Sequence, residues 1–346
     1  MEETGTILKN GIELSFLLPC YNVAKYLGDC VNSIISECDG MSYEIIAADD
    51  ASTDDTLARL NELAMAHSCL KVVANEKNSG VSVTRNRLID MAKGKYVWFV
   101  DPDDEIIGGG CAKKMVALTK EHDLDVLIGD YYEVNEGAEI SLEDLGSPND
   151  AKFTVGDDMR VCARNQHGAI AGSVCMGIMK RQFLISNGLR FNPDVGMKED
   201  VLFNFEKGLL KGRVGRFQYP VYLYKVRAGS ATTSKGEAFQ IRNVESSIAT
   251  IEVYRDYEKR LGDVNNVRAR IKAEAEGCLL ALSRIGDDSQ FRRLLKRLKE
   301  QKLYPFRFRW KRLKESGSFL RKISEFMIQV PIVLAATRFL RKKIKR

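Results

Sequence analysis

The sequence predicts an α/β protein, with a mostly parallel sheet flanked by helices and a helical, strongly basic C-terminal extension. Two observations carry this prediction: short apolar runs alternate with helix-periodic segments through the first 130 residues, and basic side chains gather in the last 56. With 346 residues, 45% of them hydrophobic and 29% charged, the chain has room for a buried core and is neither a disordered nor a fibrous protein.

Five short apolar runs have the length of buried strands, and the first of them stops at Pro19, which cannot donate to a sheet ladder. The runs cover residues 14–18, 43–48, 70–74, 96–100 and 125–129.

Between these runs, apolar residues recur three and four positions apart, as on the buried face of a helix. The expected helices cover residues 23–35, 54–67, 81–92 and 112–121. Strands that alternate with helices in this way form parallel sheets with right-handed crossovers. Ligands bind such sheets beyond the carboxyl ends of the strands.

Polar side chains follow three of the predicted strands at those ends. We expect seven of them to meet at one edge of the sheet: Tyr21, Asp49, Asp50, Ser52, Asp101, Asp103 and Asp104. Five carboxylates this close repel one another unless a cation compensates them. Each Asp could instead cap a turn or a helix, but two acidic clusters after two core strands favour a ligand site. Carboxylates without histidine or thiolate suit Mg²⁺ or Mn²⁺ in the company of substrate phosphates.

The net charge of +6 averages two unlike parts. Residues 291–346 hold 19 basic and 3 acidic side chains, whereas the other 290 residues hold 34 basic and 44 acidic ones. The eight cysteines are scattered without metal-ligand spacing, which favours reduced thiols over a disulfide framework. The acidic start, Met1 to Thr4, is unlike a signal peptide, so we expect a cytoplasmic protein.

Four motifs occur in order within the first 105 residues. They are P-C-Y-N at 19–22, E-I-I-A-A-D-D-A-S-T-D at 44–54, N-S-G-V-S-V-T-R-N at 78–86 and G-K-Y-V-W-F-V-D-P-D-D at 94–104. Together they resemble the family 2 inverting glycosyltransferases, which have the GT-A (Rossmann-like) fold. The resemblance continues through 176–203 and 222–230 and covers residues 12 to 235.

The resemblance implies a nucleotide-sugar site. Asp50 would accept a hydrogen bond from the nucleotide base, in a pocket lined by Pro19 and Tyr21. Asp101 would contact the ribose, directly or through the metal. Asp103 would be the main metal ligand, with Asp104 in or near its coordination shell.

Further residues complete this expected site: Asn22, Asp49, Ser52, Gly80, Arg85, Lys225 and Arg227. Arg85 would organise the carboxylates or reach the diphosphate, although a simple ion pair with a nearby Asp explains it as well. Gly80 would let the backbone approach the nucleotide, or would only start a helix. Lys225 and Arg227 would close over the diphosphate, or lie in a solvated loop.

The acceptor hydroxyl must lose its proton to a carboxylate as it attacks the anomeric carbon. The resemblance places this base in the pair Glu199-Asp200, and we assign Asp200, with Glu199 as the alternative or as a ligand of the acceptor hydroxyl. The pair could also simply begin a helix. His167, in the loop before the acceptor-side strands, is a weaker site candidate.

We therefore expect three parts. Residues 1–235 would form the catalytic domain, with a nucleotide-sugar half (12–130) and an acceptor half (131–235). Residues 236–290 would form a helical extension and 291–346 a basic amphipathic tail. Its apolar stretch, 326–336, would span about 16 Å as a helix, half of a bilayer core, so it does not cross a membrane.

Aromatic and aliphatic anchors beside clustered cations predict that the tail binds an anionic membrane surface. Nucleic-acid binding and a solvated or oligomerising helix are the alternatives for the tail. The function that we expect is transfer of a sugar from a nucleoside-diphosphate sugar, preferably a UDP-sugar, to a glycan or lipid-linked acceptor at the inner membrane face, as in surface polysaccharide synthesis. A non-catalytic nucleotide-sugar or nucleic-acid binding protein with the same fold is the alternative, and no nucleic-acid partner is expected.

Overall fold

A computed structural model describes residues 11–138, 140–159, 173–227 and 236–301. The chain divides into two compact units. The first, the sheet unit, extends to Pro193 and takes up the chain again from Glu199 to Ala228. The second, the helical unit, combines the short segment Asp194–Lys198 with the chain from Gly229 onward.

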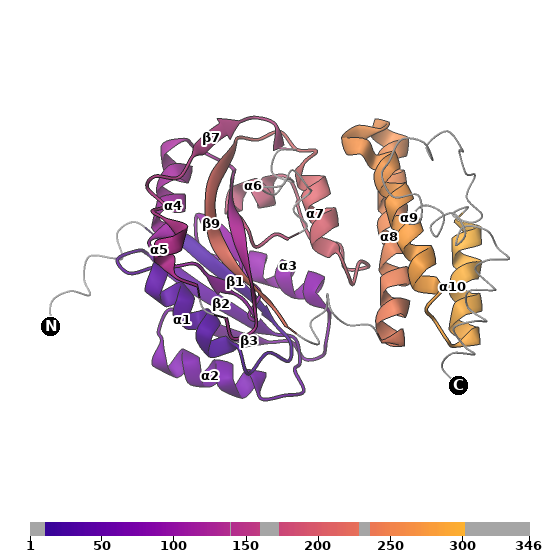
Figure 1. The fold of residues 1–346 in the computed structure, drawn as a ribbon, viewed down its shortest axis with the longest axis horizontal. Coiled ribbons are helices and arrows are strands. Elements are labelled where there is room, and N and C mark those ends of the chain that lie inside the picture. The colour runs from indigo at the N-terminus through magenta and orange to yellow at the C-terminus, as the bar shows by residue number, and fades with distance from the viewer. Residues whose placement is uncertain (1–10, 139, 160–172, 228–235, 302–346) are drawn as a thin grey trace. The chain divides into compact units, whose positions relative to one another are not determined.

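The described part of the sheet unit holds a nine-stranded sheet (Figure 1). Its strands are β1 (Leu14–Cys20), β2 (Tyr43–Asp49), β3 (Leu70–Ala74), β4 (Tyr96–Phe99), β5 (Glu105–Ile106), β6 (Val126–Asn135), β7 (Phe153–Gly156), β8 (Gly177–Lys180) and β9 (Val214–Val226). They lie in the order β3-β2-β1-β4-β8-β6-β9-β5, and β7 pairs with β9.

Four of the five strands predicted from the sequence, β1 to β4, form the parallel half of this sheet, and the fifth corresponds to β6. β1 pairs in parallel with both β2 and β4, and β2 with β3, so the carboxyl ends of β1, β2 and β4 lie at one edge. β6 and β9 are also parallel. β8 runs antiparallel between β4 and β6, and β5 and β7 are antiparallel to β9. The predicted α/β fold is confirmed.

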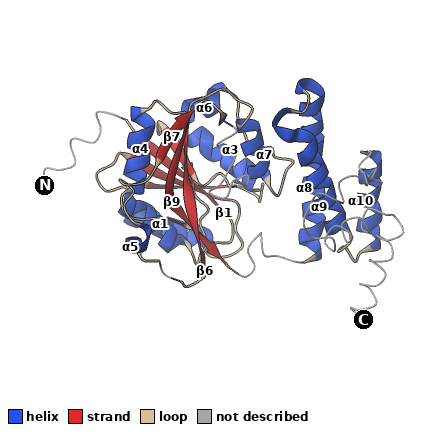
Figure 2. Cartoon of the chain, turned by 45° about the horizontal axis from the view of Figure 1, so that its top comes forward, coloured by secondary structure: helices blue, strands red, loops and turns tan. Residues whose placement is uncertain are grey.

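The helices cover both faces of the sheet (Figures 1 and 2). They are α1 (Leu27–Glu37), α2 (Thr56–Ala66), α3 (Val81–Met91), α4 (Cys111–Glu121), α5 (Leu142–Leu145), α6 (Arg181–Ser186) and α7 (Glu199–Lys207). α1, α2 and α4 lie on one face, and α3, α6 and α7 on the other. α3 returns the chain from β3 at the sheet's edge to β4, and this reversal of direction puts it on the face opposite α1 and α2.

Aromatic side chains fill the layer between the sheet and α7. The ring of Phe191 stacks on Phe203 of α7 at 4.2 Å between centroids, and meets Phe99 of β4 edge-on at 5.3 Å. All three rings are buried, and such contacts add about 0.5–1.5 kcal/mol per pair to the burial of their area. This packing fixes α7 against the end of β4, where the acidic motif begins.

The helical unit has its own core. α8 (Glu237–Leu261) and α9 (Val267–Leu282), with the short 3₁₀ turn Val264–Asn266 between them, pack with α10 (Asp288–Glu300). Among the described residues, no helix is long and apolar enough to cross a bilayer.

The predicted boundary between the helical extension and the basic tail, at residue 291, falls inside α10. Phe291, Leu294 and Leu298 are buried among α8 and α9, so this apolar face belongs to the core of the helical unit. The remainder of the predicted tail, 302–346, and His167 lie outside the described residues.

Candidate active site

The first site carboxylate, Asp50, follows β2 and is buried. One of its oxygens, Oδ1, accepts hydrogen bonds from the Asn75 side-chain amide at 2.7 Å and the Ser79 N–H at 2.8 Å. The other accepts from the Gly80 N–H at 2.8 Å. Gly80 has φ +86° and immediately precedes α3. Asp50 thus holds the loop that leads into α3, and Gly80 begins that helix.

The loops after β1 and β2 are tied together. Asn22 has φ +54°, and its side-chain oxygen accepts from the Thr53 N–H at 2.8 Å. The backbone N–H of Asn22 donates to Ser52 Oγ at 3.0 Å. Asp49 Oδ2 accepts from the Ser52 N–H at 3.2 Å, while its buried Oδ1 has no hydrogen-bond partner among the residues that the structure describes. Tyr21 is 46% exposed, which leaves its ring accessible for a ligand.

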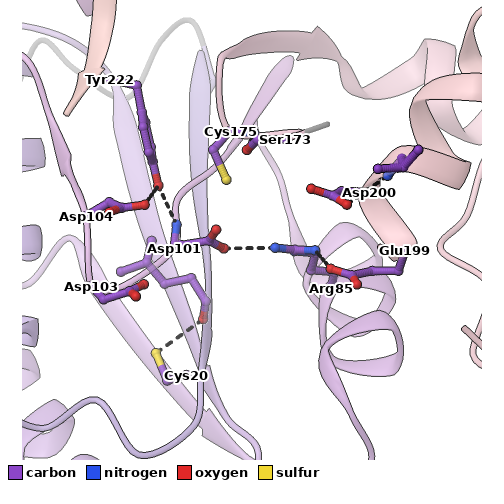
Figure 3. Close-up of polar contacts among 12 residues, drawn as sticks. Cys20, Arg85, Asp101, Asp103, Asp104, Ser173, Cys175, Glu199, Asp200 and Tyr222 are labelled. Atoms are coloured by element: carbon purple, nitrogen blue, oxygen red, sulfur yellow. Dashed lines mark hydrogen bonds and ion pairs between the residues drawn. The ribbon is translucent and has the colours of Figure 1, made fainter. Parts of the chain in front are cut away.

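The second acidic cluster, Asp101, Asp103 and Asp104, follows β4 and is hydrogen-bonded to Tyr222 of β9 (Figure 3). The Tyr222 hydroxyl accepts from the Asp101 N–H at 3.1 Å and donates to Asp104 at 2.9 Å. Asp104 also accepts from the Lys225 N–H at 2.9 Å. Burial, reinforced by Asp103 and Asp101, raises the pKa of Asp104 to about 8.

Asp103 forms an ion pair with Arg227 at the end of β9. The Arg227 guanidinium lies over the Tyr26 ring, 4.3 Å from its centroid. Burial and the neighbouring Asp101 nevertheless hold the pKa of Asp103 above its usual range. Lys225 instead pairs with Glu105, so in this structure only its backbone N–H reaches the acidic cluster.

Arg85 of α3 joins the end of β4 to α7. Its side chain is 5% exposed and donates to Asp101 at 2.8 Å and to Glu199 at 2.5 Å (Figure 3). The guanidinium also lies 5.2 Å from the Phe191 ring centroid. The sequence allowed two interpretations of Arg85, an ion pair with an Asp or a residue that organises the carboxylates. Both have support here, because Arg85 forms an ion pair with Asp101 and also connects Asp101 to Glu199.

Asp200 lies in the first turn of α7, and its side chain points toward Asp101 (Figure 3). Its Oδ1 accepts from the Val201 N–H at 2.8 Å. Burial and the adjacent Glu199 raise the pKa of Asp200 to about 7, against an opposing effect of Arg85. A carboxylate with a pKa near the working pH is suited to general-base catalysis.

Sequence reasoning did not assign three residues that shape the site. Asn86 grips the backbone of Phe191, donating to its carbonyl at 2.8 Å and accepting from its N–H at 2.9 Å. Tyr222 and Tyr26 contact the acidic cluster and Arg227, respectively. Asn86 and Tyr222 both lie inside the motifs quoted above, so the signal was present without an indication of their partners.

The acidic cluster fits a divalent cation held jointly with a ligand. Within the described ranges, no three His, Cys, Asp or Glu side chains are arranged as a complete ligand set. Asp101 and Asp103, however, offer hard oxygens, and their mutual repulsion, which contributes to the raised pKa of Asp103, is what a cation would relieve. Mg²⁺ commonly binds through one or two carboxylates, with phosphate oxygens supplying the remainder.

The sequence profile of the Glycosyl transferase family 2 matches residues 15–178. This range contains β1 to β4 and both acidic clusters. Residues 15–178 of this chain form a glycosyl transferase family 2 domain. It is therefore a nucleotide-sugar-dependent glycosyltransferase of enzyme class 2.4.

Two curated relatives are similar in sequence to this chain. "Glycosyltransferase GlyG" of Streptococcus pneumoniae is 26% identical over 245 residues, 67% of this chain and 76% of the relative. "Minor teichoic acid biosynthesis protein GgaB" of Bacillus subtilis is 25% identical over 258 residues, 72% of this chain but only 27% of the relative. The chain thus spans about three quarters of GlyG and about a quarter of GgaB.

Two solved structures share the fold. S. aureus TarS 1–349 in complex with UDP-GlcNAc has a TM-score of 0.53 and 19% identity, over 86% of this chain and 94% of that one. The mannosyltransferase PcManGT of Pyrobaculum calidifontis, in complex with GDP-Man and Mn²⁺, has a TM-score of 0.53 and 16% identity, over 97% and 89%. Both similarities concern the fold.

Proposed function

We propose that this enzyme moves a sugar, with inversion, from a nucleoside-diphosphate sugar to a glycan or lipid-linked acceptor in cell-surface polysaccharide synthesis. The observation that carries the proposal is the bridge from Asp101 through Arg85 to Glu199. It joins the acidic end of β4, where we place the donor, to the α7 turn that bears the proposed base.

The donor would bind at the carboxyl ends of β1, β2 and β4. Tyr21 has an exposed ring that a base can stack on, with Pro19 beside it. The nucleotide bound by TarS, UDP, supports a UDP-sugar as the first donor to test. Asp50 retains acceptor capacity beyond its three hydrogen bonds, because a carboxylate can accept about four.

Asp101 and Asp103 would hold Mg²⁺ or Mn²⁺ together with the diphosphate, with Asp104 in or near the shell. When bound, the cation would neutralise the departing diphosphate. Arg227, which pairs with Asp103 here, is near enough to the acidic cluster to bind phosphate oxygens. Lys225 lies two positions before it, in β9. The Mn²⁺ in the PcManGT complex supports this assignment.

Asp200 would take the proton of the acceptor hydroxyl. Since Arg85 already neutralises Glu199 at 2.5 Å, Glu199 is the better-satisfied carboxylate and Asp200 the stronger base candidate. With its pKa raised to about 7, Asp200 is suited to accept a proton near neutral pH. Glu199 would then orient Arg85 and the acceptor hydroxyl.

A donor panel tests the function. UDP-glucose, UDP-galactose, UDP-GlcNAc and GDP-mannose are incubated with Mn²⁺ or Mg²⁺ and crude lipid-linked acceptors, and release of UDP or GDP is measured. We expect one donor to be used in a metal-dependent manner, and a 10²-fold or larger loss in Asp200→Asn. If the protein binds the nucleotide but turns over none of the four donors, the alternative, a nucleotide-sugar binding protein, is favoured.

The base assignment has its own control. Glu199→Gln is the neighbouring isosteric variant, and a larger loss there than in Asp200→Asn would transfer the role of base to Glu199. Asp103→Ala should abolish metal-dependent turnover in either case.

We also propose that residues 302–346 hold the enzyme at the cytoplasmic face of the membrane, where a lipid-linked acceptor lies. Support comes from their composition, with basic clusters beside aromatic and aliphatic residues. The full chain should float with anionic liposomes, and a chain ending at Gln301 should not. Equal flotation of the two would remove this proposal.

A further inference from the structure

Arg227 follows β9 directly and carries the guanidinium that pairs with Asp103. The sheet holds the backbone at this point, because Asn135 of β6 is in register with Val226 and the Glu136 N–H donates to the Val226 carbonyl at 3.0 Å. All of these residues belong to the sheet unit. A change of partner by Arg227 is therefore made by rotation of its side chain and not by movement of the strand.

The ring of Tyr26, directly before α1, supports the same guanidinium. The central carbon of the Arg227 guanidinium lies 4.3 Å from the ring centroid. Tyr26 is itself packed against the core of the sheet unit, and its hydroxyl lies 3.5 Å from Glu136 Oε1. A cation–π contact attracts a guanidinium whichever oxygen its N–H groups face. The Tyr26 ring can therefore hold Arg227 with more than one partner.

Asp103 has to be shared between Arg227 and a divalent cation. The side chain of Asp103 is 22% exposed and that of Arg227 16%, so water screens their ion pair less than it screens a surface pair. A second cation at the same carboxylate is repelled by the guanidinium. A nucleoside diphosphate, by contrast, brings oxygens that a guanidinium binds in a bidentate manner. The ligands that compete with Arg227 at Asp103 thus also bring it a new partner.

We propose that Tyr26 is a positioning residue for Arg227, which occupies the cation side of Asp103 until a divalent cation and a nucleoside diphosphate bind together. Arg227 then exchanges Asp103 for the diphosphate while its guanidinium stays on the Tyr26 ring. This inference rests on the proposed function, because it takes the diphosphate site as given. It makes the two ligands interdependent, since the metal alone has to compete with Arg227 and the diphosphate relieves that competition.

The experiment measures two affinities that need no turnover. Binding of Mn²⁺ without nucleotide is followed by the electron paramagnetic resonance of the unbound ion, and binding of UDP and of GDP at saturating Mn²⁺ by calorimetry. The variants are Arg227→Met, Tyr26→Leu, Tyr26→Phe and the double variant of the first two. Lys25→Met is the matched control, because Lys25 is a cation 5.2 Å from the same ring centroid that pairs with Glu136 and is 72% exposed. Thermal unfolding verifies that each variant is folded.

Arg227→Met should bind Mn²⁺ alone about fivefold more tightly, because a competing charge is removed, and the nucleotide with Mn²⁺ about tenfold more weakly, because a charged hydrogen bond is lost. Tyr26→Leu should weaken nucleotide binding about fivefold, whereas Tyr26→Phe keeps the ring and should stay within twofold of wild type. The double variant should match Arg227→Met, since Tyr26 acts through Arg227. Lys25→Met should stay within twofold for both ligands.

Mn²⁺ binding in Arg227→Met that is no tighter than in wild type would overturn the inference, because it would show no competition at Asp103. So would an unchanged nucleotide affinity in Arg227→Met or Tyr26→Leu, an equal loss in Tyr26→Phe, or losses that multiply in the double variant. A wild type that binds no Mn²⁺ or no nucleotide would overturn it as well. The proposed function fails separately, because a donor panel without turnover would reject sugar transfer and leave these affinities as they are.

Discussion

Replacing Arg85 with methionine tests the bridge between the two halves of the site. The guanidinium is 5% exposed, and its partner Glu199 is 11% exposed. Removing one partner of a buried ion pair leaves an uncompensated charge and costs about 3–5 kcal/mol. Asp101, 35% exposed, is screened by water and adds little. We therefore expect Arg85→Met to lower the free energy of unfolding by about 3–5 kcal/mol.

The assay is urea unfolding at pH 8. Asp90→Asn is the matched control, because Asp90 lies on the same helix and pairs with Arg190 at the surface, with Asp90 65% exposed. Such a pair is worth about 0–1 kcal/mol. A loss in Arg85→Met no larger than in Asp90→Asn would refute the reasoning that the bridge is buried and shared.

Three further predictions concern pH, packing and a backbone clamp. Transfer should rise with pH through an apparent pKa near 7, that of Asp200. Because the pKa of Asp200 is higher in the folded than in the unfolded protein, the free energy of unfolding of the wild type should fall as the pH rises from about 4 to 7. Asp200→Asn should lose both this pH dependence of the rate and this pH dependence of stability. Gly177→Ala should destabilise the protein by 3 kcal/mol or more in urea, because the new Cβ would lie 2.1 Å from the Leu127 carbonyl oxygen of β6, whereas Gly156→Ala, which has open space around its Cβ, should be near neutral. Asn86→Ala should cost about 2–4 kcal/mol in the same assay, since it leaves the N–H and carbonyl of Phe191 without their partners; an unchanged urea midpoint would show that the clamp is dispensable.

The parallel half of the fold could be predicted because its signals are local. The strands 43–48 and 70–74 match β2 and β3 within one residue, since apolar runs and their polar ends mark a buried strand wherever it pairs. β8 and the length of β9 could not be predicted in this way. β8 has four residues between β4 and β6, and its place in the sheet depends on partners more than 40 residues away.

The site divides similarly. That acidic residues gather after β2 and β4 follows from parallel pairing, and the structure places Asp50 and Asp101 at that edge. The hydrogen-bond donor that pairs with each carboxylate could not be predicted. The two hydrogen bonds Arg85–Glu199 and Tyr222–Asp104 join residues that are 114 and 118 positions apart in the sequence. The same holds for α10: its basic and apolar faces predict an amphipathic helix, but only the partner helices show that the apolar face is internal.

Arg85 donates to one carboxylate on each side of the proposed reaction, and this makes the two sides thermodynamically reciprocal. A ligand that draws Asp101 away from Arg85 leaves the guanidinium to Glu199 alone, and so alters the field at Asp200. By the same reciprocity, protonation of Asp200 would alter the affinity for a ligand at Asp101. If the donor binds at Asp101 as proposed, its binding would thereby change the proton affinity of Asp200.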